Sequence, residues 1–134
     1  MQPLFITKDQ LQRLIEYVEK QAPLEACGLL AGRNAKVEKI FFVQNQAQSP
    51  VRYMMEPVEQ LKAFEWIESN KMDLLAIFHS HPKGPETVSP TDIAESAYDV
   101  VQMVLSKNNG LWKARTFWIE NNKFEEVEIL ITSE

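Results

Sequence analysis

The sequence predicts an α/β fold in which helices flank a mixed, largely antiparallel β-sheet. Three observations lead to this class. Apolar residues recur at helical spacing near the N-terminus, several later apolar runs have the length of single strands, and Asn-rich turns separate the last of these runs. The chain has 134 residues, of which 45% are hydrophobic, so we expect a single domain over residues 1–134 with its own core.

The first predicted element is an amphipathic helix over residues 8–21. Thr7 and Gln10 have the spacing of a capping box, in which each side chain satisfies a backbone N–H of the first turn. Four apolar residues then follow at i, i+3, i+4 and i+7: Leu11, Leu14, Ile15 and Val18. This spacing gives the helix one apolar stripe, and Pro23 marks its end because proline cannot continue a helix.

Two strands joined by a tight turn are predicted next. Residues 25–31 form a buried strand, and residues 36–43 form a second one. Gly32-Arg33-Asn34 supplies the turn between them. The polar stretch 44–52 is expected to be a loop, with a short strand after it at about residues 52–55.

A second helix and a buried strand lead to the two histidines of the chain. Pro57 suits the first position of a helix, which we expect to run to about Asn70. Its apolar stripe would consist of Leu61, Phe64 and Ile67. Residues 74–78 are then a continuous apolar run of strand length that ends at His79.

The C-terminal third is predicted to be one short helix followed by three strands. Pro90 opens the helix, which we expect to end near Ala97. The strands are expected over residues 100–106, 111–120 and 123–132. Asn108-Asn109-Gly110 and Asn121-Asn122 would form the hairpin turns, because Asn and Gly accept a positive φ.

The two histidines, His79 and His81, suggest a metal site. Side chains alternate along a strand, so imidazoles two residues apart point to the same face. A catalytic zinc usually has three protein ligands and one open position. Asp92, in the first turn of the short helix, is the candidate third ligand, because the Pro- and Gly-containing loop 82–88 has the composition to fold back.

A purely structural role is the alternative at these positions. Histidine pairs with this spacing also occur at surfaces or as satisfied hydrogen-bonding residues. Ser89 and Asp92 flank an ideal helix start, with Ser at the N-cap, Pro at the first position and an acid in the first turn. Capping and metal binding are compatible, since a capped helix end is a rigid mount for a ligand.

Two segments of the chain resemble the motifs of the JAMM (MPN+) metalloproteases. One is H-x-H-x7-S-x2-D, which here comprises His79, His81, Ser89 and Asp92. The other is E-x-C-G-L-L-x-G, which begins at Glu25. The order of the predicted elements is also similar to that of the JAMM domain, which has a cytidine-deaminase-like fold, so the resemblance spans essentially the whole chain.

The resemblance implies a zinc-dependent peptidase or isopeptidase. His79, His81 and Asp92 would hold one Zn²⁺ ion. Glu25 would act as general base toward the attacking water, and Ser89 would donate a hydrogen bond to the oxyanion of the tetrahedral intermediate. The implied partners are ubiquitin-like or sulfur-carrier proteins, whose extended C-terminal tails commonly end in Gly-Gly.

Four other functions fit the sequence less well. Metal-free MPN relatives bind ubiquitin-like partners without cleaving them, but they lack ligand residues that this chain keeps. RadC-type proteins share H-x-H-x7-S-x2-D, yet they normally carry an additional helical DNA-binding domain, for which 134 residues leave no room. Two histidines and a carboxylate also suit non-haem iron, which would need neither Ser89 nor Glu25. The H-x-E and P-C-x-x-C signature of cytidine deaminases is absent.

The composition limits the kinds of partner and the cellular compartment that we expect for this protein. The net charge of −5 argues against a nucleic-acid surface, and no run approaches the roughly 18 apolar residues that cross a bilayer. Cys27 is the single cysteine, so no internal disulfide forms, and we expect a cytoplasmic protein. We expect Cys27 to be a small buried side chain, with a fourth metal ligand as the alternative. The oligomeric state is left open.

Overall fold

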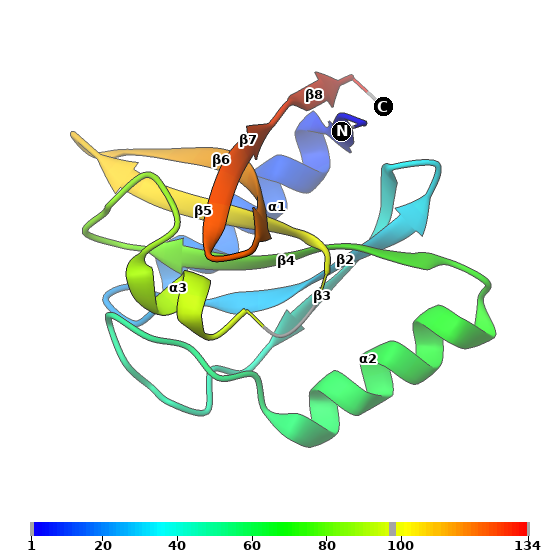
Figure 1. Cartoon of the computed structure of the whole chain (residues 1–134), viewed down its shortest axis with the longest axis horizontal. Coiled ribbons are helices and arrows are strands. Elements are labelled where there is room, and N and C mark those ends of the chain that lie inside the picture. The colour runs from blue at the N-terminus through cyan, green and yellow to red at the C-terminus, as the bar shows by residue number, and fades with distance from the viewer. Residues whose placement is uncertain (1, 97–98, 134) are drawn as a thin grey trace.

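A computed structural model describes residues 2–96 and 99–133 (Figure 1). In these ranges the helices are α1 (Lys8–Gln21), α2 (Pro57–Ser69) and α3 (Pro90–Ala94). The first four strands are β1 (Leu4–Thr7), β2 (Cys27–Arg33), β3 (Lys36–Val43) and β4 (Asp73–His81). The last four are β5 (Val101–Asn108), β6 (Leu111–Glu120), β7 (Lys123–Val127) and β8 (Ile129–Thr132).

All of these strands belong to one sheet, in the order β7-β6-β5-β4-β2-β3-β1-β8. The pairs β2–β3, β2–β4, β5–β6 and β6–β7 are antiparallel. The pairs β1–β3, β1–β8 and β4–β5 are parallel. The predicted fold class, a mixed and largely antiparallel sheet with helices on its faces, is therefore confirmed.

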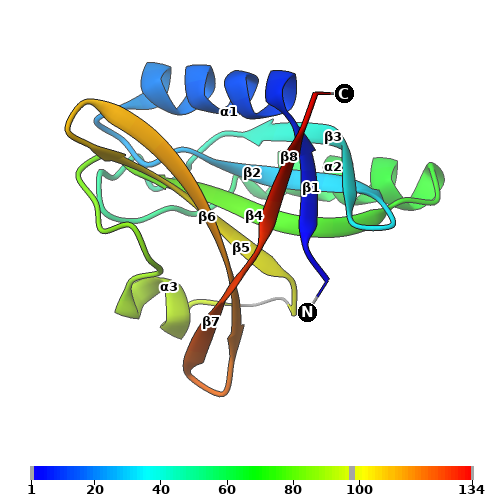
Figure 2. The ribbon, with the colours of Figure 1, turned by 90° about the horizontal axis from the view of Figure 1, so that it is seen from above.

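The sheet curls, because its two edge strands are neighbours along the chain. β7 ends at Val127 and β8 begins at Ile129, although they lie at opposite edges. Figure 2 shows this segment running from one edge of the sheet to the other. The prediction of one continuous strand over 123–132 is wrong, because the chain changes partners at Glu128, whose carbonyl accepts a hydrogen bond from the Leu4 amide at 2.9 Å.

Alternating residues of the central strands pack on opposite faces of the sheet. On one face, Phe78 of β4 packs in a buried cluster with Leu14 and Val18 of α1. On the other, Ile77 packs in a cluster with Ala63 of α2. Figure 2 shows α1 and α3 on opposite sides of the sheet. The face that carries Ile77 also carries the odd-numbered residues at the end of β4, where the histidines lie.

Several predicted elements match the structure. α1 has the predicted bounds, and Thr7 and Gln10 form the expected capping box. The strands over 36–43 and 111–120 also match. Asn109, Gly110, Asn121 and Asn122 all have positive φ, as the two predicted turns require.

Other boundaries differ for physical reasons. β2 continues to Arg33, and the positive-φ residues of its turn are Asn34 and Ala35 instead of Gly32-Arg33-Asn34. Gly32 lies inside the strand, at an irregular register, where an added Cβ would meet the Lys36 carbonyl oxygen at 1.8 Å. The expected strand at 52–55 is reduced to a single bridge between Met55 and Asn45.

The helices and the histidine strand also differ in detail. α2 has nearly the predicted bounds, but its buried residues are Ala63 and Ile67, whereas Leu61 is 58% exposed. β4 extends two residues beyond His79. α3 ends at Ala94, and Ala97, its expected end, lies outside the described residues. β1 was not predicted.

Candidate metal centre

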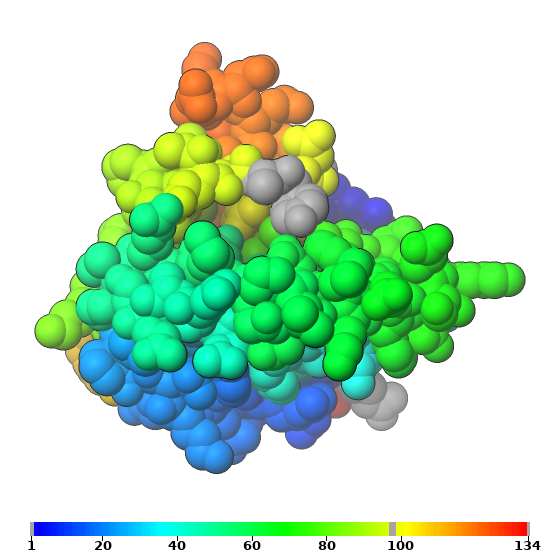
Figure 3. All heavy atoms as spheres, turned by 90° about the horizontal axis from the view of Figure 1, so that it is seen from below, coloured from blue at the N-terminus to red at the C-terminus, as the bar shows by residue number. Residues whose placement is uncertain are grey.

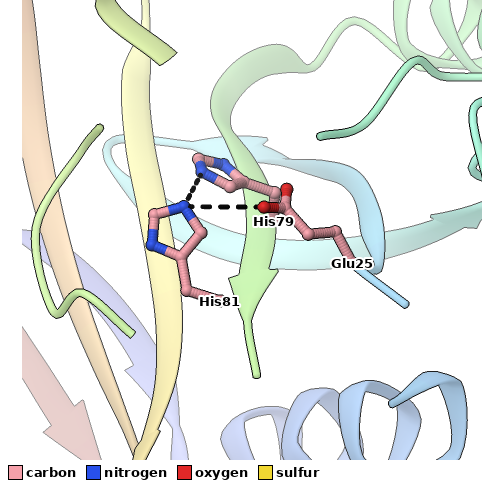
Figure 4. Close-up of side chains that lie close together, drawn as sticks. All are labelled: Glu25, His79 and His81. Atoms are coloured by element: carbon pink, nitrogen blue, oxygen red, sulfur yellow. Dashed lines mark hydrogen bonds and ion pairs between the residues drawn. The ribbon is translucent and has the colours of Figure 1, made fainter. Parts of the chain in front are cut away.

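The two histidines lie on the same face at the end of β4, as predicted. His79 is fully buried and His81 is 3% exposed. Their Nε2 atoms are 3.2 Å apart, and their ring planes meet at 67°. Figure 4 shows both imidazoles with the Glu25 carboxylate directed toward them. The backbone of β4 therefore supplies two nitrogen donors that converge on one point.

Asp92 joins the histidines from α3. Its Oδ2 atom lies 3.0 Å from His79 Nε2 and 3.1 Å from His81 Nε2. The same oxygen accepts a hydrogen bond from the Ser89 amide at 2.8 Å, and the Asp92 amide donates to Ser89 Oγ at 3.0 Å. This capping box fixes the carboxylate at the helix start. Asp92 is thus both a capping residue and a neighbour of the two imidazoles.

Glu25 lies two residues before the start of β2, the strand that pairs with the histidine strand β4. Its position is fixed by Ala26, whose amide donates to Ser80 Oγ at 2.7 Å and whose carbonyl accepts from the Ser80 amide at 3.0 Å. Glu25 is 3% exposed, and its Oε2 atom lies 3.9 Å from His81 Nε2. Among the residues that the structure describes, its Oε1 atom has no hydrogen-bond partner.

Burial and the close charges separate the acidities of the two carboxylates. Burial raises the pKa of Glu25 to about 8, although the neighbouring His81 opposes this. Burial also raises the pKa of Asp92, but the hydrogen bonds from His79 and His81 outweigh it and hold that pKa well below its usual range. In the metal-free protein Asp92 is therefore ionised, whereas Glu25 is mostly protonated at pH 7.

The pKa values of the two imidazoles are shifted in opposite directions. Burial lowers the pKa of His79. Burial also lowers the pKa of His81, but the hydrogen bond to Asp92 and the one to the Pro85 carbonyl outweigh it, so the net shift is upward. His81 Nδ1 lies 2.9 Å from Pro85 O. That bond leaves the His81 Nε2 lone pair directed into the cluster when the ring is neutral.

The donor atoms fit a zinc ion. His79 Nε2, His81 Nε2 and Asp92 Oδ2 are separated from one another by 3.0, 3.1 and 3.2 Å. Tetrahedral zinc with bonds of about 2.0–2.1 Å requires ligand atoms about 3.3–3.4 Å apart. Two imidazoles and one carboxylate, with an open position, are a common ligand set of catalytic zinc. A divalent cation would also give these three donor atoms a common partner.

Glu25 is the other oxygen donor near the imidazoles. Glu25, His79 and His81 each offer one atom within 4.8 Å of the others, so this trio could also hold a metal ion. Asp92 lies closer to both imidazoles than Glu25 does to His81. The distances therefore favour Asp92 as the third ligand, with Glu25 beside the ligand set.

Cys27 is buried in the core beside this site. It pairs with His79 in the β2–β4 register, and its Sγ lies 3.4 Å from the Val43 carbonyl oxygen, to which the thiol donates. Burial raises the pKa of the thiol to about 12. Cys27 is therefore a small buried core residue, as expected from the sequence.

A cavity of about 210 Å³ adjoins Asp92. Its walls include Tyr53 and Met54 from the loop before α2, and Glu95 from the end of α3. Arg52 Nη2 lies 2.5 Å from Glu95 Oε2, so an ion pair joins the two walls. Figure 3 shows the loop and α3 facing each other across a groove on this side of the molecule.

Two charged residues of the loop 82–88, Lys83 and Glu86, lie outside this group of donor atoms. Glu86 accepts a hydrogen bond from the Asn108 side chain and lies 3.9 Å from Arg115. Lys83 is exposed. No helix in residues 2–96 and 99–133 is long and apolar enough to cross a membrane.

Comparison with protein families identifies the family of this chain. A model of prokaryotic homologues of the JAB domain matches residues 7–120. The chain belongs to this family. The resemblance to JAMM proteins that the two sequence motifs indicated is therefore confirmed, and the residues of both motifs fall within the matched region of this prokaryotic JAB domain.

Three relatives of this JAB domain have descriptive names. A desampylase of Pyrococcus furiosus is 34% identical over 130 residues, which cover 96% of this chain and 90% of the relative. A probable TtuB-protein conjugate cleaving protease of Thermus thermophilus is 37% identical, covering 75% of this chain and 68% of the relative. A CysO-cysteine peptidase of Mycobacterium tuberculosis is 30% identical, covering 67% and 63%.

Solved structures agree with the JAB-domain fold. The solution structure of a Desulfitobacterium hafniense protein has a TM-score of 0.87 at 30% identity, covering 98% of this chain and 94% of the other. The crystal structure of a JAB1/MPN domain protein from Archaeoglobus fulgidus has a TM-score of 0.60, covering 96% and 98%. At 16% identity, the second likeness supports the fold alone.

Proposed function

We propose that this chain is a zinc-dependent metallopeptidase of the JAMM type. It would hydrolyse peptide or isopeptide bonds at the C-terminal tails of ubiquitin-like or sulfur-carrier proteins. The observation that carries the proposal is the convergence of His79, His81 and Asp92 on one point, with a buried carboxylate beside them. The names of the relatives, a desampylase, a conjugate cleaving protease and a CysO-cysteine peptidase, support the substrate class.

The ligand set is proposed to be His79 Nε2, His81 Nε2 and Asp92 Oδ2. Bound Zn²⁺ supplies a Lewis acid that polarises a carbonyl group and lowers the pKa of water to about 7. The protein fixes these donors from two elements. β4 provides both imidazoles, and the capping box of α3 holds the carboxylate against them.

Glu25 is the proposed general base. It is a buried carboxylate beside the proposed ligands, and it lies farther from His81 Nε2 than Asp92 does. Burial raises its pKa to about 8, and a cation at the neighbouring ligands would favour the ionised form. Such a carboxylate can accept a proton from the attacking water and pass it to the leaving amine.

Ser89 is the proposed oxyanion donor. Its Oγ atom accepts a hydrogen bond from the Asp92 amide. This bond uses an oxygen lone pair and leaves the hydroxyl hydrogen available. The hydroxyl can therefore donate to the oxygen that gains charge in the tetrahedral intermediate. Because the same bond caps α3, the donor is held in place before the substrate arrives.

A pair of variants tests the function. Wild-type protein should contain one zinc per chain and release the carrier from a fusion in which a ubiquitin-like carrier tail ending in Gly-Gly precedes a reporter. Glu25→Gln should keep its zinc and lose hydrolysis, because the amide cannot accept the proton. Mass spectrometry of the products and metal analysis of each protein measure both results.

His81→Ala is the matched control, since it should lose zinc as well as activity. Full activity in Glu25→Gln would show that the general base is another group. Wild-type protein that holds zinc but binds carrier proteins without cleaving them would instead support the alternative of a non-catalytic binding module.

A further inference from the structure

The two imidazoles of the site are held in different ways. His81 Nδ1 lies 2.9 Å from the Pro85 carbonyl oxygen and donates to it when the ring is neutral with its Nε2 unprotonated. His79 Nδ1 is buried and has no hydrogen-bond partner within residues 2–96 and 99–133. A metal-binding histidine usually has such a partner, because that bond fixes the tautomer and the ring orientation. Another contact must therefore orient His79.

Tyr53 makes that contact. Its ring centroid lies 4.7 Å from that of His79, and the planes are inclined by only 21°, so the two rings are stacked. Tyr53 lies in the loop between β3 and α2 and packs against the buried cluster that contains Met55 and Ile77. The phenol ring is thus supported by the core and presents one face to the imidazole. No motif in the sequence marks this residue.

We propose that Tyr53 is a positioning residue that acts through His79. It holds the imidazole so that Nε2 points toward the other two donors of the cluster. The inference rests on the metal site proposed above. The face of an aromatic ring is electron-rich, and an imidazole becomes more positive when it binds a cation. The stack is therefore stronger with metal bound, and Tyr53 contributes to metal affinity as well as to orientation.

Two substitutions distinguish the effect of the Tyr53 ring from that of its hydroxyl group. Tyr53→Leu removes the aromatic face but keeps apolar bulk, whereas Tyr53→Phe keeps the face. We expect Tyr53→Leu to bind Zn²⁺ about tenfold more weakly in competition with a chelator, the lower end of effects seen for groups that support metal ligands. The visible spectrum of the Co²⁺-substituted variant should also change. Tyr53→Phe should match the wild type in both measurements.

Kinetics on the carrier fusion add a third readout. A misplaced ligand impairs the chemical step, so kcat should fall in Tyr53→Leu with KM little changed. Tyr17→Leu is the matched control. It also removes a tyrosine ring packed on another ring, that of Phe42 at 4.5 Å, but in the cluster under α1 on the other face of the sheet. It should lower stability and leave zinc affinity unchanged.

Each other result has a defined meaning. The inference fails if Tyr53→Leu binds zinc as tightly as the wild type while KM rises, because Tyr53 would then only line the cavity. It also fails if Tyr53→Phe loses as much affinity as Tyr53→Leu, because the hydroxyl would then be responsible. Wild-type protein that binds no zinc would contradict the proposed function itself, which separates the two failures.

A measurement on the wild type covers the case in which Tyr53→Leu does not fold. A ring stacked on a phenol face experiences its ring current, so the carbon-bound protons of His79 should resonate upfield of those of His81 in the NMR spectrum. Tyr53→Phe should keep this shift. Unshifted His79 signals in folded, zinc-loaded protein would overturn the inference.

Discussion

At the scale of single residues, Asp92 combines two tasks in one oxygen atom. Its Oδ2 accepts a hydrogen bond from the Ser89 amide and faces both imidazole Nε2 atoms. Ser89 Oγ in turn accepts a hydrogen bond from the Asp92 amide. The pair therefore couples the start of α3 to the proposed metal ligands, so in the proposed mechanism a change at Ser89 would act on both the helix cap and the chemistry.

Ser89→Ala tests the proposed oxyanion donor. Losing one such donor typically lowers kcat by about 10²–10³-fold, whereas losing an N-cap costs only about 1 kcal/mol of stability. We expect the variant to fold and to retain zinc while kcat on the carrier fusion falls by roughly this factor. Steady-state kinetics and metal analysis of the same preparation measure the two effects.

Ser89→Thr is the control, because threonine keeps both a hydroxyl group and a capping oxygen. It should retain most of the activity. If Ser89→Ala instead loses zinc in proportion to its activity, the hydroxyl group acts by placing Asp92 and not by stabilising charge in the substrate. A loss of less than twofold would remove Ser89 from the mechanism.

At the scale of elements, the close packing of β2 between β3 and β4 places the site. Gly28 pairs with Phe42 on one side and Phe78 on the other. An added Cβ would lie 2.1 Å from the Phe41 carbonyl oxygen and 2.3 Å from the Phe78 ring. The glycine of the E-x-C-G-L-L segment is therefore required by packing, in the strand pair that brings Glu25 next to the histidines.

Gly28→Ala should destabilise the protein. Forcing extra atoms into a packed core typically costs about 1–3 kcal/mol, because side chains and backbone must shift. Urea unfolding followed by circular dichroism gives the free energy of unfolding. Gly110→Asn is the matched control, since this turn position has positive φ and open space around it, and asparagine accepts that conformation. Equal stability of Gly28→Ala and wild type would contradict the packing argument.

The same elements show what the sequence can predict. Strong periodicity and turn chemistry identified α1, β3, β6 and the Asn turns, because those signals are local. β1 was missed because four residues carry too little pattern, and β7 and β8 were merged because no turn residue marks the change of partner at Glu128. β4 looked shorter than it is because its last residues, His79 to His81, are polar.

The residues of the candidate site likewise include some that the sequence could predict and some that it could not. The two histidines on one strand face follow from β alternation alone. Asp92 could not be separated from a simple helix cap by spacing, because both roles need an acid in the first turn. Tyr53 gave no signal, since its stack on His79 joins residues far apart in sequence whose approach depends on the folded loop before α2.

At the scale of the whole molecule, the proposed ligand set joins parts of the chain that otherwise have few contacts. His79 and His81 belong to the central sheet, whereas Asp92 belongs to a five-residue helix with no fully buried residue. α3 packs on the sheet mainly through Val88 before it and Ile93 within it. A metal ion bound to all three side chains would therefore fasten α3 and loop 82–88 to the sheet.

Removing metal should lower stability and loosen this region first. A ligand that binds only the folded state stabilises it by RT ln(1 + [L]/Kd), about 4 kcal/mol when zinc is at 1,000 times its Kd. We expect zinc-loaded protein at that excess of zinc to melt on the order of 15 °C higher than EDTA-treated protein, since about 1 kcal/mol shifts the midpoint of a domain this size by about 4 °C. Hydrogen exchange should accelerate most in residues 82–95, with the amides of β2 and β4 still protected.

His81→Ala supplies the control for this measurement. Without one imidazole the variant should melt at the same temperature with and without zinc, because the ion no longer binds the folded state selectively. If zinc stabilises His81→Ala as much as the wild type, the ion binds elsewhere. If exchange in residues 82–95 is unaffected by zinc in the wild type, Asp92 does not ligate the metal. Glu25, the other oxygen donor within reach of both imidazoles, would then be its replacement in the ligand set.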